Sequence, residues 1–277
     1  MRYLFRTILA LIMLLLCASR NDAAVKLTSL CGVRFPSVAS IEWDCVKLTW
    51  KDTPEKLFGT GWQDVLRFNR MDRRHFYGGM SIKVPRRLEE IKGFSPLPSF
   101  YPEAEADEKF ILVDQSEMFL GAYERGKLVV SFPAAVGIEG HRVPNGEFRI
   151  DAIDKRHTSN MYTVEEIGRR YPMHYGLRFF MDKSLPTTPS YFIHGRDMPG
   201  YPASHGCIGI YDEEMQIEYY GAYDRKVYGR NYHGLKPPLL EGAKSLYRWV
   251  VGNHDDPGRF HNIDYGPRVK IIGTPPL

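Results

Sequence analysis

Residues 193–207 read IHGRDMPGYPASHGC, and the prediction of the fold and of the functional site depends on this stretch. His194 closes a strand-like run, a loop rich in proline and glycine follows, and the stretch ends on Cys207. Such a loop turns readily, so we expect it to bring His194 beside Cys207. A cysteine reacts as its thiolate, and an imidazole within hydrogen-bond reach can take the thiol proton. His194 and His205 are the candidates for that base, and Gly206, which lacks a Cβ, lets backbone N–H groups approach and stabilise an oxyanion.

Two other interpretations fit the same residues. The two histidines and the cysteine, joined by His233, are all zinc-ligand types, although paired spacings such as C-x-x-C are absent. Alternatively, Cys207 is a buried structural residue and both histidines bond to the backbone. The convergence of three such side chains on one loop favours a nucleophile, so we expect no metal and no organic cofactor.

Short apolar runs separated by turns surround this stretch. Arg125-Gly126 lies between two of them and is typical of a tight hairpin turn. A run with helical spacing predicts a helix over residues 240–251. The pattern predicts a mainly β domain with few helices that begins near Lys109, with strands at 110–113, 118–123, 127–132, 146–150, 191–194 and 269–272.

Ser204-His205-Gly206-Cys207, preceded by His194-Gly195, resembles the signature of the L,D-transpeptidase catalytic domain, the YkuD-like family of bacterial cell-wall enzymes. The resemblance spans residues 109–273. It implies a catalytic domain built as a β-sandwich or barrel with a few helices. Four further blocks resemble the family in the same order, namely residues 110–114, 131–133, 144–148 and 172–175.

The resemblance implies a role for each residue of the signature. Cys207 is the nucleophile, His194 is the proton donor and acceptor, and His205 shapes the site. Gly206 belongs to the same signature. Gly195 stands where some members have serine, whose backbone carbonyl orients the histidine, and glycine keeps that carbonyl.

The resemblance also places Ser204, Tyr175 and Gly209 at the substrate. Members of the family usually carry arginine or asparagine where this chain has Gly209. A side-chain contact to the substrate or to the loop is therefore either missing or made by another residue. Residues 212–238 are inserted relative to the family. Their tyrosines and basic residues predict either a packing flap or a strip that binds an acidic peptide or a glycan.

Residues 40–90 form a separate small unit. A strand at 46–50, two helical patterns around Leu57 and Val65, and a strand at 81–85 are predicted. This order resembles a LysM glycan-binding module, a small α+β unit, and a packing subdomain without a ligand is the alternative. Residues 91–108, rich in proline and acidic residues, predict a semi-rigid linker.

Residues 1–24 have the pattern of a signal peptide. Two arginines precede an apolar run at 8–16, and small residues follow. We expect export to the periplasm or cell envelope, with an uncleaved membrane anchor as the alternative. Of the four cysteines, Cys17 is expected to leave with the signal. In that oxidising compartment Cys31 and Cys45 either form a disulfide or remain two buried thiols, and pairing them leaves Cys207 as the odd thiol.

The charge of the chain does not call for a nucleic acid partner. The 277 residues carry a formal net charge of +4, and removing a signal with three arginines and one aspartate leaves about +2. The resemblance implies partners in peptidoglycan, its stem peptides and glycan strands, and an anchored protein as another possible acceptor. The sequence leaves the oligomeric state open.

The expected function is peptidoglycan L,D-transpeptidation in cell-wall biogenesis. Cys207 forms a thioester with a tetrapeptide stem and passes it to an amine of another stem or of a protein. Two alternatives stay open: an L,D-carboxypeptidase or hydrolase that uses water as acceptor, and a wall-binding scaffold that has lost its activity.

Overall fold

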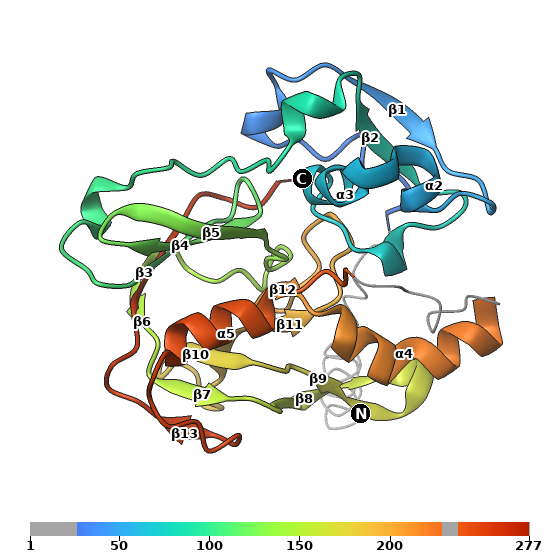
Figure 1. Ribbon diagram of the computed structural model, residues 1–277. Coiled ribbons are helices and arrows are strands. Elements are labelled where there is room, and N and C mark those ends of the chain that lie inside the picture. Colours follow the sequence, from blue (N-terminus) through green and yellow to red (C-terminus); the bar gives the residue numbers. More distant parts are fainter. Residues whose placement is uncertain (1–26, 229–237, 277) are drawn as a thin grey trace, which may run out of the picture.

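The computed structural model describes residues 27–228 and 238–276, and two five-stranded sheets contain most of the strand residues in those ranges (Figure 1). The signal peptide predicted at 1–24, and the anchor that is its alternative, lie outside the described residues. Within the described ranges, no helix combines the length and apolar character needed to cross a membrane.

The first sheet follows the predicted runs closely. Arg125 and Gly126 both have positive φ, 46° and 79°, as a tight hairpin turn of the predicted kind requires. The strand order is β5-β4-β3-β14-β6, with β14 parallel to β3. The strands are β3 (Phe110–Asp114), β4 (Phe119–Glu124), β5 (Lys127–Pro133), β6 (Gly146–Arg149) and β14 (Arg268–Ile272).

The second sheet carries the His194 and Cys207 stretch. Its order is β12-β11-β10-β7-β13, and β11 and β12 run parallel to each other. Parallel neighbours need a crossover connection, and here the Pro/Gly loop makes it. The strands are β7 (Ala152–Asp154), β10 (Gly176–Met181), β11 (Ser190–Arg196), β12 (Ile208–Tyr211) and β13 (His261–Asn262).

Helix α5 (Ala243–Val251) packs against β10 and β11 and buries Leu246 and Val250 (Figure 1). It begins three residues later than predicted. The reason is that the preceding residues pair with the end of β12: Glu241 bridges Asp212, and the Gly242 N–H donates to the Tyr211 carbonyl at 2.9 Å.

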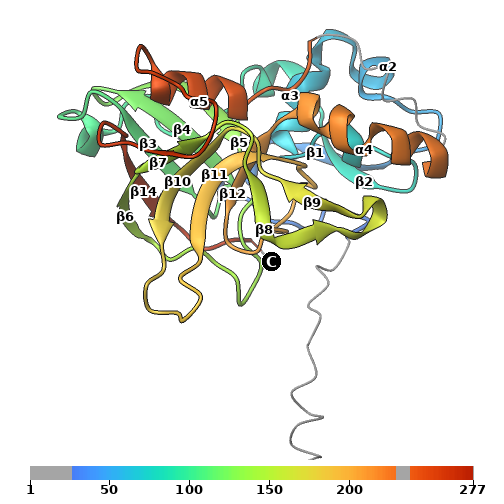
Figure 2. The same cartoon turned by 90° about the horizontal axis from the view of Figure 1, so that it is seen from below.

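The predicted insertion at 212–238 begins with a long helix, α4 (Glu213–Tyr228), which lies beside the hairpin of β8 (Thr158–Val164) and β9 (Arg169–Pro172) (Figure 2). Tyr220 is buried, and Tyr219 packs beneath the Arg169 guanidinium at 4.0 Å. These aromatic side chains are occupied in packing, which favours the flap interpretation. Residues 229–237 lie outside the described residues.

The N-terminal unit has the predicted order of strand, helix, helix and strand. β1 (Trp43–Lys47) pairs antiparallel with β2 (Ser81–Pro85), and α2 (Pro54–Phe58) and α3 (Trp62–Phe68) lie between them in the chain. β1 ends three residues earlier than predicted because Thr49 and Asp52 form a turn. The likeness of this unit to a LysM module stays a prediction.

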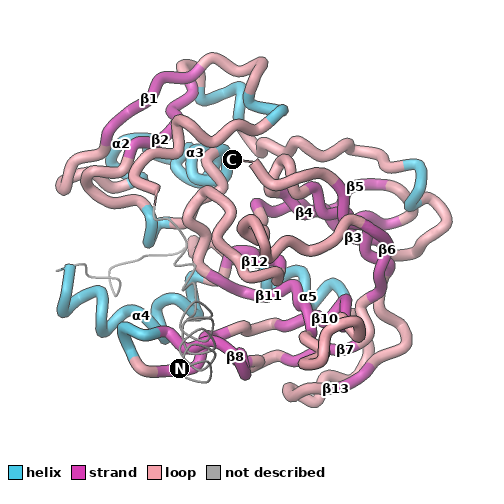
Figure 3. The backbone as a smooth tube through the Cα atoms, turned by 180° about the vertical axis from the view of Figure 1, so that it is seen from behind, coloured by secondary structure: helices cyan, strands magenta, loops and turns pink. Residues whose placement is uncertain are grey.

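Cys31 and Cys45 form a disulfide, which settles the alternative left open by the sequence. Cys207 is the free cysteine of the described residues. Leu97 and Ala104 of the predicted linker at 91–108 are buried in one hydrophobic cluster with Phe110 of β3. Figure 3 shows the chain between β2 and β3 running beside the first sheet. One hydrophobic cluster continues from the N-terminal unit into both sheets, so the two parts share a core.

Candidate active site

The strand register places His194 and Cys207 on the same face of the second sheet. Ile193 pairs with Ile208 and His194 with Gly209 in the parallel ladder of β11 and β12. Cys207, one residue before β12, therefore lies across from the residue before Ile193. Side chains alternate along a strand, so Cys207 and His194 project to one face while both isoleucines enter the core. The loop doubles back as the sequence predicts.

His194 is oriented by a backbone carbonyl. Its Nδ1 lies 2.8 Å from the Gly195 carbonyl oxygen. A carbonyl only accepts, so Nδ1 carries the hydrogen and Nε2 is free of a proton in the neutral ring. Burial lowers the pKa of His194 to about 3, even though the Gly195 bond opposes this shift. His194 is therefore a neutral imidazole with Nε2 available as a base.

Cys207 is a half-buried thiol. Burial raises its pKa to about 11, against the smaller effects of a hydrogen bond from the Phe192 backbone and of the Arg196 charge. Burial thus disfavours the thiolate before substrate binds. The resting pair is a neutral thiol and a neutral imidazole.

Aromatic rings surround the thiol end of the loop. His205 stacks on Tyr162 with ring centroids 4.7 Å apart and meets His141 edge-on at 5.0 Å. Gly206 has a φ of 119°, and a Cβ there would lie 2.4 Å from the Tyr191 ring. Glycine is required at this position by the close approach of Tyr191 as well as by the backbone conformation.

Ser204 anchors the signature through its backbone. Its N–H donates to the Val136 carbonyl at 3.0 Å, and its carbonyl accepts from the Ile138 N–H at 2.9 Å. Ser204 is buried. The structure therefore ties the start of the signature to the chain that follows β5.

The Arg196 side chain covers Gly209. A Cβ on Gly209 would lie 1.9 Å from the Arg196 Cδ atom, so the arginine stem occupies the space that a side chain at 209 would need. The Gly209 backbone exchanges hydrogen bonds with Ala135 at 2.7 and 2.9 Å. Arg196 of the neighbouring strand therefore covers Gly209 on the face that carries His194 and Cys207.

Tyr175 lies in a different environment from the aromatic rings near the thiol. Its backbone has a positive φ of 57°, and its ring packs edge-on against Tyr247 of α5 at 5.7 Å. The structure therefore groups Tyr175 with α5.

Asp212 lies directly behind the histidine-bearing strand. Its Oδ1 accepts from the Met215 N–H at the start of α4, while its buried Oδ2 has no hydrogen-bond partner among the described residues. Burial raises the pKa of Asp212 to about 7. A Cβ on Gly195 would lie 2.4 Å from that Oδ2, so Asp212 leaves no room for a side chain at position 195.

Sequence reasoning did not identify Arg196, Tyr162, Tyr191 or Asp212. Of these four, only Arg196 could have been predicted from the sequence, because it follows His194 by two residues and so lies on the same face of the strand. The other three reach the site through contacts between distant segments. His233, the fourth residue of the zinc interpretation, lies outside the described part of the chain.

Comparison with solved structures finds L,D-transpeptidases. One from Xylanimonas cellulosilytica is 18% identical, with 75% of this chain and 78% of that chain covered and a TM-score of 0.42. One from Stackebrandtia nassauensis is 16% identical, with 61% and 58% covered and a TM-score of 0.37. L,D-transpeptidase 1 of Mycobacterium tuberculosis is 13% identical, with 60% and 62% covered and a TM-score of 0.34.

The alignments to the last two structures reach about three fifths of those chains. A search of curated proteins found no match. The YkuD profile, which describes the L,D-transpeptidase catalytic domain, matches residues 108–255, more than half of the chain. The parallel strands with their histidine and cysteine lie inside that match, and the chain belongs to the YkuD family of L,D-transpeptidase catalytic domains.

Proposed function

We propose that the protein is a peptidoglycan L,D-transpeptidase with Cys207 as its nucleophile. The family supports the reaction class. The observation that carries the assignment of residues is the bond from His194 Nδ1 to the Gly195 carbonyl, on the strand next to Cys207. It leaves Nε2 as the basic atom on the face that the thiol shares.

In the proposed reaction, the Cys207 sulfur attacks the carbonyl carbon that joins the third and fourth residues of a tetrapeptide stem. The thiol proton passes to His194 Nε2, and backbone N–H groups near Gly206 stabilise the oxyanion. The carbon–nitrogen bond then breaks. His194 returns the proton to the leaving amine, D-alanine departs, and a thioester remains on Cys207.

The second half of the reaction releases the enzyme. An acceptor amine attacks the thioester carbonyl carbon and gives its proton to His194 Nε2. The carbon–sulfur bond breaks, the new amide is released, and the proton returns to the Cys207 sulfur. The aromatic group of Tyr162, Tyr191 and His205 is proposed to contact the stem peptide above the thiol.

A carbapenem is a direct probe of the proposed nucleophile. Intact mass spectrometry of the full chain should show one covalent adduct, and Cys207→Ala should show none while melting at the wild-type temperature. Cys31 and Cys45 are held in a disulfide and do not compete for the probe. An adduct that persists in Cys207→Ala contradicts the assignment.

The acceptor is tested with purified muropeptides. Release of D-alanine together with stem dimers supports transpeptidation. Release without dimers identifies a hydrolase, and no release from a sample that still sediments with sacculi identifies a scaffold. We propose export to the cell envelope on the N-terminal sequence pattern. Detection of the protein only in a cytosolic fraction contradicts that localisation.

A further inference from the structure

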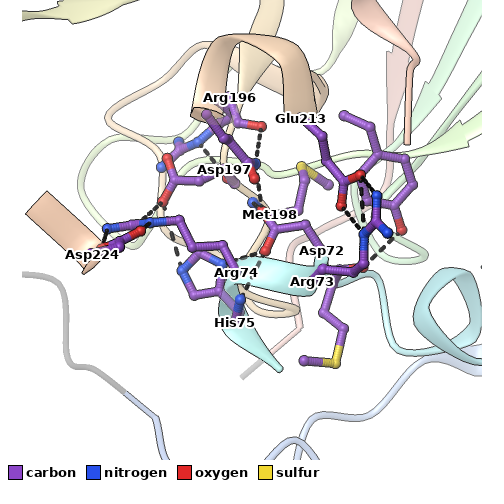
Figure 4. Close-up of polar contacts among 12 residues, drawn as sticks. Asp72, Arg73, Arg74, His75, Arg196, Asp197, Met198, Glu213 and Asp224 are labelled. Carbon is purple, nitrogen blue, oxygen red and sulfur yellow. Dashed lines mark hydrogen bonds and ion pairs between the residues drawn. The ribbon is translucent and has the colours of Figure 1, made fainter. Parts of the chain in front are cut away.

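The loop that joins His194 to Cys207 is bound along its length by the N-terminal unit. Met71 forms a bridge with Pro199, and the Asp72 N–H donates to the Met198 carbonyl at 2.9 Å. In return, the Met198 N–H donates to Asp72 Oδ2 at 2.6 Å. Figure 4 shows Asp72 directed at this part of the loop. The N-terminal unit therefore supplies backbone partners that the loop does not find within the second sheet.

Asp72 is completely buried and fully hydrogen-bonded. Its Oδ2 also accepts from Gln216 Nε2 in α4 at 2.7 Å. Its Oδ1 accepts from the backbone N–H and lies 2.7 Å from Nδ1 of His75. A single carboxylate thus joins the N-terminal unit, the catalytic loop and α4.

Asp197 fixes the adjoining position of the loop. It accepts from the Tyr171 hydroxyl at 2.7 Å, forms an ion pair with Arg74 at 3.8 Å and lies 3.7 Å from His75 Nε2. Arg74 also binds Asp224 of α4 at 2.9 Å (Figure 4). Although burial raises the pKa of Asp197, the charges of Arg196, His75 and Arg74 outweigh it and hold that pKa well below its ordinary value.

Gly200 brings the two parts into van der Waals contact. Its φ is 88°, and a Cβ would lie 2.6 Å from Leu30 and 2.8 Å from the Asn69 carbonyl oxygen. Both contacts belong to the N-terminal unit. The loop is therefore held by charge, by hydrogen bonds and by close packing from the same side.

We propose that Asp72 is a positioning residue for Cys207, so that the N-terminal unit is part of the catalytic machinery. This inference rests on the proposed function. Holding an irregular loop in one conformation costs conformational entropy at each residue, and partners have to offset that cost. If the N-terminal unit served glycan binding alone, Asp72 would not affect the reaction of Cys207 with a small molecule.

The test compares three variants of the full chain in their rate of acylation by a carbapenem, measured by intact mass well below each melting temperature. Asp72→Ala leaves the Met198 N–H buried without a partner, and we expect acylation at least tenfold slower. Asp72→Asn keeps one oxygen for Met198 and Gln216 and loses the acceptor for His75. We expect it to melt lower than wild type but to be acylated within about threefold of it. Asp44→Ala removes an exposed partner of Arg86 in the same unit and should match wild type.

Two results overturn the inference. Folded Asp72→Ala that is acylated at the wild-type rate shows that the loop does not need this carboxylate. If the acylation rate of Asp72→Asn falls together with its melting temperature, Asp72 has only a structural role. If Asp72→Ala does not fold, the Asp72→Asn comparison decides. A different result, the absence of any adduct on the wild-type protein, would contradict the proposed function itself. The inference about Asp72, which rests on that function, would then be wrong as well.

Discussion

Arg196 and Gly209 act as a matched pair at the residue scale. The arginine stem needs the space above Gly209, and its guanidinium contributes to lowering the pKa of Cys207 against the effect of burial. The positive charge thus reaches the thiol from β11 rather than from β12. Substituting both residues makes it possible to separate the effect of packing from the effect of charge, which a single substitution changes together.

We expect Gly209→Ala to displace the Arg196 stem and to cost about 1–3 kcal/mol in the free energy of unfolding, as overpacking does. The double variant with Arg196→Ala should be no less stable than Arg196→Ala alone, because the clash is gone. It should still be acylated more slowly than wild type, because the charge is gone too. Urea titrations and acylation rates check the two halves, and full recovery of the acylation rate would mean that the charge is irrelevant.

The neutral resting pair predicts a particular pH profile. With the pKa of Cys207 raised to about 11 by burial, the thiolate fraction increases tenfold per pH unit up to about pH 10. We expect alkylation by iodoacetamide, followed by intact mass, to accelerate throughout that range. The unlabelled control is Cys207→Ala, and both proteins are used without residues 1–24, which contain Cys17. A rate that is already constant at pH 7 would reveal a preformed thiolate.

Helix α4 begins on a buried carboxyl whose second oxygen has no partner among the described residues. Burial raises the pKa of Asp212 from 3.8 to about 7, so this contribution stabilises the fold below about pH 4 and is lost as pH rises through 7. Asp212→Asn keeps the helix cap and removes the charge. Relative to wild type, the variant should gain on the order of 2 kcal/mol at pH 8 and little at pH 4. Urea titrations at both pH values measure the difference, and an equal gain at both excludes the carboxyl as its cause.

The turn between β1 and α2 offers the clearest surface for testing the LysM-like prediction. Trp50 is 79% exposed, and one side of its ring packs on Gly78. Aromatic rings of this kind bind sugars by stacking, so we expect Trp50→Ala to reduce sedimentation with purified sacculi and to leave carbapenem acylation unchanged. Leu57→Ala, another exposed apolar residue of the unit, is the control. Unchanged sedimentation of Trp50→Ala removes this surface from consideration.

At the scale of the whole molecule, the shared hydrophobic cluster predicts that the N-terminal unit and the two sheets unfold together. Reduction of the Cys31–Cys45 disulfide should then lower the free energy of unfolding by about 3 kcal/mol, the amount typical of a loop this short. The midpoint of the single transition should fall accordingly. Circular dichroism and tryptophan fluorescence should give coincident curves. Separate transitions would show that the two parts fold independently.

The sequence predicted what depends on neighbours in the chain. The strands of the first sheet, the hairpin at Arg125-Gly126 and the return of the loop from His194 to Cys207 follow from local patterns of apolar and turn residues. Arg196 over Gly209 and Asp72 on Met198 were not predictable, because each depends on the register or docking of segments that a single sequence does not relate. The packing of the predicted linker was not predictable for the same reason, because Leu97 and Ala104 are buried beside a strand that follows them in the chain.

The short spacing of Cys31 and Cys45 also bears on how the chain avoids mispairing during oxidative folding. The two are 14 residues apart, whereas Cys207 is distant from both in sequence. Closing a short loop costs less entropy than closing a long one, so the local pair is the faster to find each other. Among the cysteines of the described residues, Cys207 is thereby left with a reduced thiol.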